Sequence, residues 1–400
     1  MKILFLSTAP WGPSSYSVLT ARTVPEIVRQ GHEVHISTWY GLQGAPQRWP
    51  IRARGAEKTE PPLSTVVVYP SFDGNSFGVD TLLATYKVMN ADCLITCMDA
   101  WVLPPAITGR VKFAAWLPVD HDPAPANVVQ ALSTCIYPIA FSRWGRQVLK
   151  QAGVEAHYIP CSADSNVFQP MDKAEARKSV GVPEDCDYLA AMVAANKDPS
   201  DRKGFGEALI AFAQFCRTHP KAMMYIHTNW EGPINITALA DRLGLAGRLI
   251  RPEPLSIIYG LLNDQFLKAV YCASDLLLNP SKSEGFCLPI VEAQMCGTSV
   301  AATDFSTTDE LVFGGFKIEG QPHWSLGADS FRKLVYIDSV REALEWGWEN
   351  LGNEVLAKRA REGACEYDTA HVAETYWRPA LKDIEDMVSA KGGEMKLVQL

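Results

Sequence analysis

The sequence predicts an α/β protein made of two Rossmann-like domains. Its 400 residues exceed the usual size of one domain and fit two. Residues 2–38 read as a short apolar strand, a polar loop, a helix that stops at Gly31 and a second strand, which is the usual opening of a Rossmann-like domain. The same order returns over residues 188–215, where an apolar strand leads through a basic loop into a helix.

In the first half of the chain, we expect ligand-binding side chains where apolar strands end, because open α/β sheets bind ligands at the carboxyl ends of their strands. The loop after the first strand has no GxGxxG string, so a dinucleotide-dependent dehydrogenase is not supported. The candidates lie after three of the expected strands and are Gly12, Ser14, Ser15, Asp99, Trp101, Asp120, His121 and Asp122.

The Asp120–His121–Asp122 string also fits the D-x-D pattern, in which two carboxylates hold a divalent ion on a diphosphate. Three residues are weak evidence for such a site. We therefore predict no metal ion and keep D-x-D as an alternative.

Residues 39–62 read as one long irregular stretch that mixes aromatic and basic side chains, among them Trp49, Arg48, Arg52, Arg54 and Lys58. Long loops of this kind are either functional or simply solvated. Aromatic rings stack on sugars or bases and arginines bind phosphate, so acceptor contact and a solvated loop are both open readings.

In the second half, a basic loop precedes a helix that begins near Phe205. It carries Lys197, Arg202 and Lys203. Cations at a helix N-terminus oppose the helix dipole, so an anion is expected to compensate them. A solvated basic loop is the plainer alternative.

Residues 283–297 are the most informative stretch. An apolar strand run precedes them, Pro289 suits the start of a helix and Gly297 suits its end. The amides of Gly285, Phe286 and Cys287 would then face an anion at the positive end of that helix. Two carboxylates, Glu284 and Glu292, flank this site and can accept hydrogen bonds from sugar hydroxyls. Two glutamates at this spacing are also common by chance.

The string SEGFCLPIVEAQMCG resembles the E-x7-E signature of retaining glycosyltransferases with the GT-B fold, family 4 in particular. The resemblance implies two Rossmann-like domains that face a central cleft. It places the acceptor-binding domain at residues 1–170 and the donor-binding domain at 171–370, with the linker near residues 171–182. It also implies that a C-terminal helix, in residues 371–400, crosses back to the first domain.

The resemblance further implies roles for individual residues. Glu284 would contact the donor sugar and Glu292 the ribose, while Lys203 would neutralise the leaving diphosphate. Lys197 stands where the family usually has arginine, and His121 would lie near the sugar and the acceptor hydroxyl. The remaining donor-binding residues would be Arg202, Arg251, Pro252, Gly285, Phe286, Cys287 and Leu288.

We therefore expect a retaining, metal-independent transferase that needs no cofactor and takes a UDP-linked sugar as donor. The rivals are a non-catalytic nucleotide-sugar sensor and a sugar epimerase of the same fold. Three strings, LPVDHDPAP, VAANKDPSDRKGF and SEGFCLPIVEAQMCG, also look like stand-alone glycosyltransferases of bacteriophages. Hydroxymethylated pyrimidines in DNA are then one possible acceptor, beside glycan, lipid and protein acceptors.

The net charge of −8 is unevenly spread, with 13 Lys and Arg against 12 Asp and Glu in residues 1–170. This balance argues against bulk binding of nucleic acid or membrane. The 10 cysteines form no CxxC pair, so zinc and disulfides are not indicated. No run is long and apolar enough to span a bilayer, and the N-terminus reads better as a buried strand than as a signal peptide. We expect a cytoplasmic protein.

Overall fold

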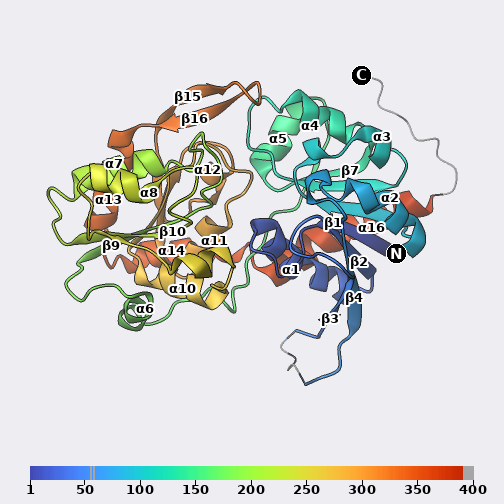
Figure 1. Cartoon of the computed structure of the whole chain (residues 1–400), viewed down its shortest axis with the longest axis horizontal. Coiled ribbons are helices and arrows are strands. Elements are labelled where there is room, and N and C mark those ends of the chain that lie inside the picture. The colour runs from blue at the N-terminus through green and yellow to red at the C-terminus, as the bar shows by residue number, and fades with distance from the viewer. Residues whose placement is uncertain (55, 57–58, 391–400) are drawn as a thin grey trace. The chain divides into compact units, whose positions relative to one another are not determined.

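The computed structural model describes residues 1–54, 56 and 59–390 and shows two α/β units (Figure 1). The first unit contains Met1–Ser162 and the C-terminal segment from Thr369 onward, and the second contains Ala163–Asp368. The sequence-based boundaries were 170/171 and 370/371, so residues 163–170 belong to the second unit instead of the first.

The sheet of the first unit has eight strands in the order β3-β4-β2-β1-β5-β6-β7-β8. Its ladders are parallel except for the β3–β4 pair. β5 and β6 are buried from end to end and β1 is buried from Ile3 onward, as expected for a parallel sheet that is covered on both faces. The strands are β1 (Lys2–Ser7), β2 (Glu33–Thr38), β3 (Gln47–Ile51), β4 (Ser64–Pro70), β5 (Cys93–Cys97), β6 (Phe113–Leu117), β7 (Cys135–Ala140) and β8 (His157–Tyr158).

Helices follow the strands of the first unit, and capping serines mark where two of them begin. The Ser14 hydroxyl accepts a hydrogen bond from the Ser17 amide at 3.1 Å, and the Ser142 hydroxyl accepts one from the Gly145 amide at 2.9 Å. The helices are α1 (Ser15–Arg29), α2 (Val79–Met89), α3 (Pro105–Thr108), α4 (Ala126–Ala131) and α5 (Arg143–Gln151), with short 3₁₀ turns at Gly74–Ser76, Ala100–Val102 and Leu132–Thr134.

Residues 39–62 are not one irregular stretch, because β3 lies within them and pairs antiparallel with β4. β3 runs away from the carboxyl edge of the sheet, since Ile51 pairs with Ser64 at the start of β4. Arg54 therefore follows at the opposite edge, where its guanidinium lies 2.8 Å from the Glu26 carboxylate. Lys58 lies outside the described residues.

The C-terminal segment packs on the first unit, as the sequence predicted. It is helical without a break from α15 (Thr369–Val372) through a π-helical turn (Ala373–Trp377) to α16 (Arg378–Ser389), and residues 391–400 lie outside the described residues. The Trp377 ring meets the Trp116 ring edge to face at 5.0 Å. The Tyr137 hydroxyl donates to Asp383 at 3.0 Å.

The sheet of the second unit has six parallel strands in the order β11-β10-β9-β12-β13-β14. Numbered from its own first strand, this is the 3-2-1-4-5-6 order of a Rossmann fold. The strands are β9 (Tyr188–Val193), β10 (Ala222–His227), β11 (Leu249–Ile250), β12 (Leu276–Asn279), β13 (Ser299–Thr303) and β14 (Gly315–Ile318).

Helices cover both faces of this second sheet, with α7, α8 and α13 on one face and α10, α11 and α14 on the other (Figure 1). An antiparallel hairpin, β15 (Gly320–Ser325) and β16 (Ser330–Val335), has no counterpart in the sequence-based prediction. The helices are α6 (Lys173–Val180), α7 (Phe205–Phe215), α8 (Ile236–Arg242), α9 (Pro254–Ile258), α10 (Asp264–Ala273), α11 (Leu288–Met295), α12 (Thr307–Leu311), α13 (Ile337–Glu349) and α14 (Glu354–Cys365).

Each sheet has one point where the direction of strand addition reverses. It lies between β1 and β5 in the first unit and between β9 and β12 in the second. Ligands of open α/β sheets bind outside the carboxyl ends of the strands at this point. The loops after these four strands are therefore the first places to look for a site.

We expect Trp377→Ala to destabilise the first unit by about 3–5 kcal/mol, because it deletes a large ring from the core. Trp377 is only 2% exposed. The loss of stability is measured by urea unfolding, with amide hydrogen exchange used to monitor the first unit. The matched control is Met387→Ala on the same C-terminal segment, where the side chain is 48% exposed. Equal stability of the two variants would contradict the packing role of the segment.

Candidate functional site

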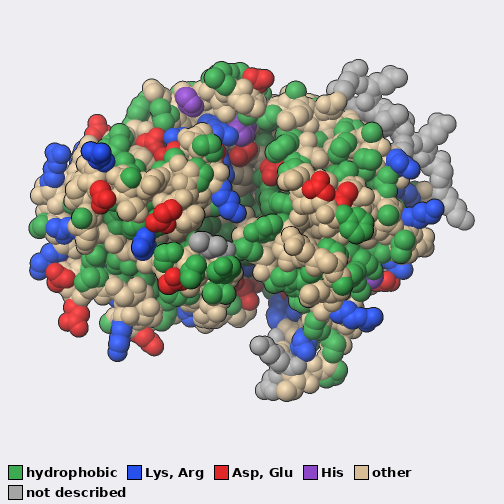
Figure 2. Space-filling view, viewed as in Figure 1, with side chains coloured by type: hydrophobic (Ala, Val, Ile, Leu, Met, Phe, Trp, Pro, Cys, Tyr) green, Lys and Arg blue, Asp and Glu red, His purple; other side chains and the backbone are tan. Residues whose placement is uncertain are grey.

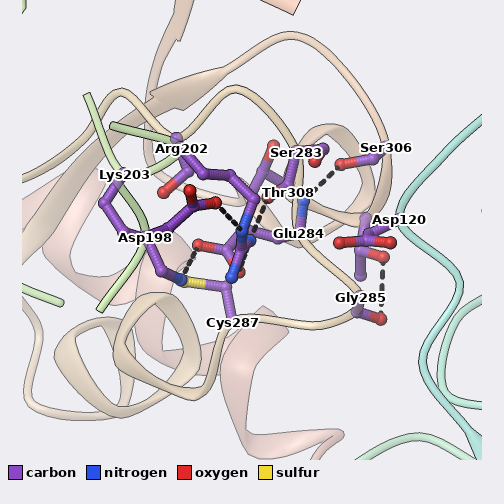
Figure 3. Close-up of polar contacts among 12 residues, drawn as sticks. Asp120, Asp198, Arg202, Lys203, Ser283, Glu284, Gly285, Cys287, Ser306 and Thr308 are labelled. Carbon is purple, nitrogen blue, oxygen red and sulfur yellow. Dashed lines mark hydrogen bonds and ion pairs between the residues drawn. The ribbon is translucent and has the colours of Figure 1, made fainter. Parts of the chain in front are cut away.

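Three loops of the second unit meet at the carboxyl ends of adjacent strands (Figure 3). They comprise residues 194–204 after β9, 280–287 after β12 and 304–306 after β13. We refer to them together as the loop cluster. Most of the donor-binding residues predicted from the sequence lie in this cluster.

Glu284 is the centre of the loop cluster, and it is 5% exposed. Its carboxylate lies 2.5 Å from the Lys203 ammonium and 3.3 Å from the Arg202 guanidinium. Burial by itself would raise the pKa of this carboxyl, but the charges of Lys203 and Arg202 outweigh burial and lower it. Glu284 is therefore an ionised carboxylate held between two cations.

Hydrogen bonds hold the loop after β9 against the loop after β12. The Lys282 amide donates to the Arg202 carbonyl at 2.7 Å. The Arg202 guanidinium donates to the Ser283 carbonyl at 2.6 Å. Gly204 has φ +72°, and a Cβ there would lie 2.4 Å from the Pro280 carbonyl oxygen. Only glycine allows this approach, which places Lys203 beside Glu284.

Carboxylates of the chain lie against this basic loop and the helix that it precedes. The Asp201 carboxylate accepts hydrogen bonds from the Phe205 and Gly206 amides at 2.9 and 2.8 Å, so it caps α7. Glu284 in turn compensates Lys203.

Glu292 lies on α11 and is 4% exposed. It accepts a hydrogen bond from the buried Tyr271 hydroxyl at 2.9 Å. Burial and then the Glu292 charge raise the pKa of Tyr271, so the phenol stays protonated and donates. The helix ends as predicted, since Gly297 has φ +83° and its amide and that of Thr298 close a Schellman motif.

The residues between the two glutamates contribute backbone more than side chains. Phe286 and Leu288 are buried, at 5% and 8% exposure. The Cys287 sulfur accepts a hydrogen bond from the Asn279 amide at 3.1 Å, and Cys287 itself has φ 93°. Together with Gly285, these residues lead into the N-terminal end of α11, where amides attract anions.

The other predicted donor-binding residues lie farther from Glu284. Lys197 is exposed and forms no ion pair with any described residue of the second unit. Arg251 follows β11, which is separated from β12 by two strands. Its guanidinium lies 3.2 Å from the Glu231 carboxylate and 5.5 Å from the centre of the Trp230 ring. Pro252 is buried.

In the first unit, the loop after β1 contains a cluster of hydroxyls. The Ser14 oxygen lies 3.1 Å from that of Thr8 and 2.9 Å from that of Ser17. Ser14 is thus occupied as a helix cap, whereas Ser15 is exposed. A Cβ at Gly12 would lie 2.6 Å from the Ser17 hydroxyl oxygen, so the loop packs tightly against α1.

The strand ends β5 and β6 add two pairs of polar side chains. The Tyr16 hydroxyl donates to the Asp99 carboxylate at 2.8 Å, and burial followed by the Asp99 charge raises the pKa of Tyr16. Trp101 is 53% exposed beside this pair. His121 is buried, and its Nδ1 lies 2.6 Å from the Asp120 carboxylate. The sequence did not predict the contact between Tyr16 and Asp99, because the two residues are 83 positions apart in the chain.

Asp122 follows this pair in the chain, but the described residues contain no group of three or more His, Cys, Asp or Glu side chains that could hold a metal ion. Nor does any described helix have the length and apolar character needed to cross a membrane.

Sequence reasoning also missed residues that contact Glu284 and Gly285. The Ser306 hydroxyl accepts a hydrogen bond from the Glu284 amide at 3.1 Å, and the Thr307 hydroxyl donates to the Gly285 carbonyl at 3.1 Å. Ser306 stands at the N-cap position of α12, yet its side chain makes no cap hydrogen bond to that helix. Its partner is more than 20 residues earlier, which no local pattern reveals.

The two doubly wound units define the GT-B class of fold, the architecture of many glycosyltransferases. Within the second unit, residues 197–320 match the family model described as "Glycosyl transferases group 1". The matched segment contains the whole loop cluster from Lys197 onward. It covers Lys203, Glu284 and Glu292.

Known proteins are similar to this chain over different lengths. The D-inositol 3-phosphate glycosyltransferase of Segniliparus rotundus is 33% identical over 148 residues, which is 36% of this chain and 30% of that relative. The chain spans about half the length of other curated relatives with this description.

Solved structures match almost the whole chain. The sucrose-phosphate synthase of Thermosynechococcus elongatus superposes with a TM-score of 0.74 at 15% identity, covering 96% of this chain and 100% of that one. The Anabaena protein HepE in complex with UDP-glucose gives a TM-score of 0.67 at 17% identity, with 96% and 100% covered. At these identities the likeness establishes the fold.

We expect Glu284→Gln to lower the free energy of unfolding at pH 7 by about 1–3 kcal/mol, because it leaves two half-buried cations, Lys203 and Arg202, without their counter-charge. The folded pKa of Glu284 lies below the unfolded value. Its contribution is therefore present above about pH 4 and is lost as the pH falls through the folded pKa. The measurement is the free energy of unfolding of the wild type and of Glu284→Gln from pH 7 down to pH 3. The difference between the two proteins should become smaller as the pH falls.

The control for this pH series is Glu362→Gln, because Glu362 forms an exposed pair with Lys358. It should leave stability unchanged at every pH. A stability difference between wild type and Glu284→Gln that does not depend on pH would contradict the ionised state of Glu284.

We expect Tyr271→Phe to cost about 1–3 kcal/mol of stability, since the buried Glu292 carboxylate loses a hydrogen-bond donor. The ring itself is retained, so no cavity forms. Thermal unfolding beside Tyr259→Phe, whose side chain is 67% exposed, provides the comparison. Equal melting temperatures of the two variants would show that the Tyr271–Glu292 contact contributes nothing.

Proposed function

We propose that this protein is a retaining glycosyltransferase that moves a sugar from a nucleoside diphosphate to an acceptor hydroxyl. The observation that carries the proposal is the placement of Glu284 between Lys203 and Arg202. These groups lie at the point where strand order reverses, inside the segment that matches a glycosyltransferase family. That is where an α/β sheet binds a nucleotide.

The donor in this proposal is a UDP-linked sugar, bound by the second unit. HepE, which shares the fold, is described in complex with UDP-glucose. The diphosphate would lie against the amides at the start of α11 and the ammonium of Lys203. Glu292 would accept hydrogen bonds from the ribose, and Lys197 and Arg251 would line the outer parts of the donor.

Binding of the donor would rearrange the ion pairs around Glu284. The diphosphate would take Lys203 and Arg202 as partners, which frees the Glu284 carboxylate to accept hydrogen bonds from the donor sugar. As the glycosidic bond breaks, negative charge grows on the diphosphate beside these cations. Fixed charge aimed at developing charge is commonly the largest catalytic contribution. Protein cations then serve in the place of a metal ion.

The acceptor in this proposal is a small hydroxylated molecule that binds at the carboxyl edge of the first unit. Asp120 with His121, and Asp99 with Tyr16, offer paired polar groups there. Attack from the face that the diphosphate leaves retains the configuration of the sugar, and the diphosphate itself can accept the acceptor's proton. The curated relatives, whose name contains inositol 3-phosphate, point to a polyol phosphate as the first acceptor to test.

Modified DNA gains no support as an acceptor. The basic stretch 39–62 could contact a base or a phosphate, but its Arg54 lies at the opposite edge of the sheet and pairs with Glu26. On the face drawn in Figure 2, acidic and basic side chains are intermixed over the second unit. A polyanion favours an extended surface of one sign.

The test is incubation with a panel of UDP-sugars, with and without acceptors, followed by chromatography of the products. Release of free UDP indicates a transferase, an isomerised donor indicates an epimerase, and binding without either indicates a sensor. We expect Lys203→Ala to reduce transfer by about 10²–10³-fold, because it removes a charge that stabilises the leaving group. Glu284→Ala should abolish transfer.

Lys358→Ala is the matched control, since its ammonium is exposed and pairs only weakly, at 3.8 Å, with Glu362. It should transfer at the wild-type rate. Normal turnover by folded Lys203→Ala or Glu284→Ala would overturn the proposed roles.

A further inference from the structure

Ser306 has an unusual backbone conformation for a residue that carries a side chain. Its φ is 55° and its ψ is −146°. Glycine adopts this region freely, but other residues enter it only under strain, and such strain persists where the surrounding structure enforces it. Phe77 and Asn90, which also have positive φ, instead adopt the ordinary left-handed conformation. The strain at Ser306 therefore calls for a specific cause.

The plain explanation, that Ser306 caps a helix, does not hold. Ser306 stands at the N-cap position of α12, yet its side chain makes no cap hydrogen bond. Its hydroxyl is instead directed to the Glu284 amide, which donates to it at 3.1 Å (Figure 3). Both residues are buried, at 1% and 5% exposure, so water does not offer this amide an easy substitute.

The neighbouring residue holds the same peptide segment from its other end. The Thr307 hydroxyl, which is fully buried, donates to the Gly285 carbonyl at 3.1 Å. The backbone of Glu284 and Gly285 is thus held by two consecutive hydroxyls, that of Ser306 at the end of the loop after β13 and that of Thr307 at the start of α12.

The loop after β13 is itself rigid. The Thr308 hydroxyl bonds to the carbonyls of Thr303 and Phe305 at 2.6 and 2.7 Å. The ammonium of Lys333, from the β15–β16 hairpin, bonds to the Asp304 carbonyl at 2.5 Å. This loop therefore holds the backbone of Glu284 in place. The Glu284 side chain pairs with Lys203 and Arg202.

We propose that Ser306 is a positioning residue, assisted by Thr307: its hydroxyl fixes the Glu284 backbone and so determines which hydroxyls of the donor sugar the Glu284 carboxylate can reach. This role rests on the proposed function, because it assumes that Glu284 contacts the donor sugar. Small displacements of a group that binds the reacting part of a substrate are costly to turnover.

Three substitutions separate positioning from simple structural support. Ser306→Gly removes the hydroxyl and the strain together, Ser306→Ala removes the hydroxyl but keeps the strain, and Thr307→Val removes only the second hydrogen bond. The melting temperature should be higher for Ser306→Gly than for Ser306→Ala. The conservative variant Thr307→Ser keeps the hydroxyl and its hydrogen bond to Gly285. It should therefore keep the turnover and the sugar preference that Thr307→Val loses.

The matched control is Ser339→Ala in the same unit. The buried Ser339 hydroxyl also accepts a hydrogen bond from a backbone amide, that of Glu319, at 2.9 Å. The control therefore loses the same kind of contact away from the loop cluster. It should melt at a lower temperature and keep wild-type turnover and sugar preference.

The measurements are the melting temperature, the affinity for UDP alone, and kcat and KM for UDP-sugars that differ at one hydroxyl. For Ser306→Gly we expect unchanged UDP affinity, kcat lower by about 10–100-fold, and weaker discrimination among the sugars. Wild-type kcat and discrimination in Ser306→Gly would overturn the positioning role. So would losses that merely follow the melting temperature across all variants, including Ser339→Ala.

Failure of the proposed function gives a different result. In that case the wild-type protein releases UDP from none of the donors, and the positioning role falls with it. If the wild type is active and Ser306→Gly is equally active and selective, only the positioning role is wrong.

Discussion

The contact between Glu284 and its two cations, Lys203 and Arg202, is the constraint on which the candidate site depends. It joins loops that follow β9 and β12, the two strands on either side of the point where strand order reverses. A buried carboxylate without these cations would be costly, and two clustered cations without the carboxylate would repel each other. The carboxylate on the loop after β12 therefore stabilises the cations on the loop after β9, and the cations stabilise the carboxylate.

Backbone strain in the second unit is concentrated in the same place. Asp201, Cys287 and Ser306 have positive φ without being glycine, and each belongs to one loop of the cluster. In each case the side chain accepts hydrogen bonds that hold the conformation, from the α7 amides, from Asn279 and from Glu284 respectively. Residues held in such conformations gather at functional sites because a rigid surrounding structure fixes them there.

Local signals account for what the sequence predicted well. Alternating strands and helices identified the two doubly wound units, and the residue types at 283–297 marked a helix start, two acids and a glycine end. Contacts between distant segments account for what was missed. Ser306 and Tyr271 reach the glutamates only because β13 and α10 pack beside the motif. β3 and the β15–β16 hairpin are short edge or surface elements whose pairing no periodicity reveals.

The return of the C-terminal segment to the first unit sets an order of events during synthesis. The amine of Met1 pairs with the carboxylate of Glu385, 384 residues later. The ring of Trp116 packs against that of Trp377, which is also made late in synthesis. A ribosome must therefore complete the second unit before the last pieces of the first become available. Until then, Trp116 is left without the ring that covers it in the finished protein. The newly made N-terminal portion would be an incomplete domain, and a natural client for chaperones.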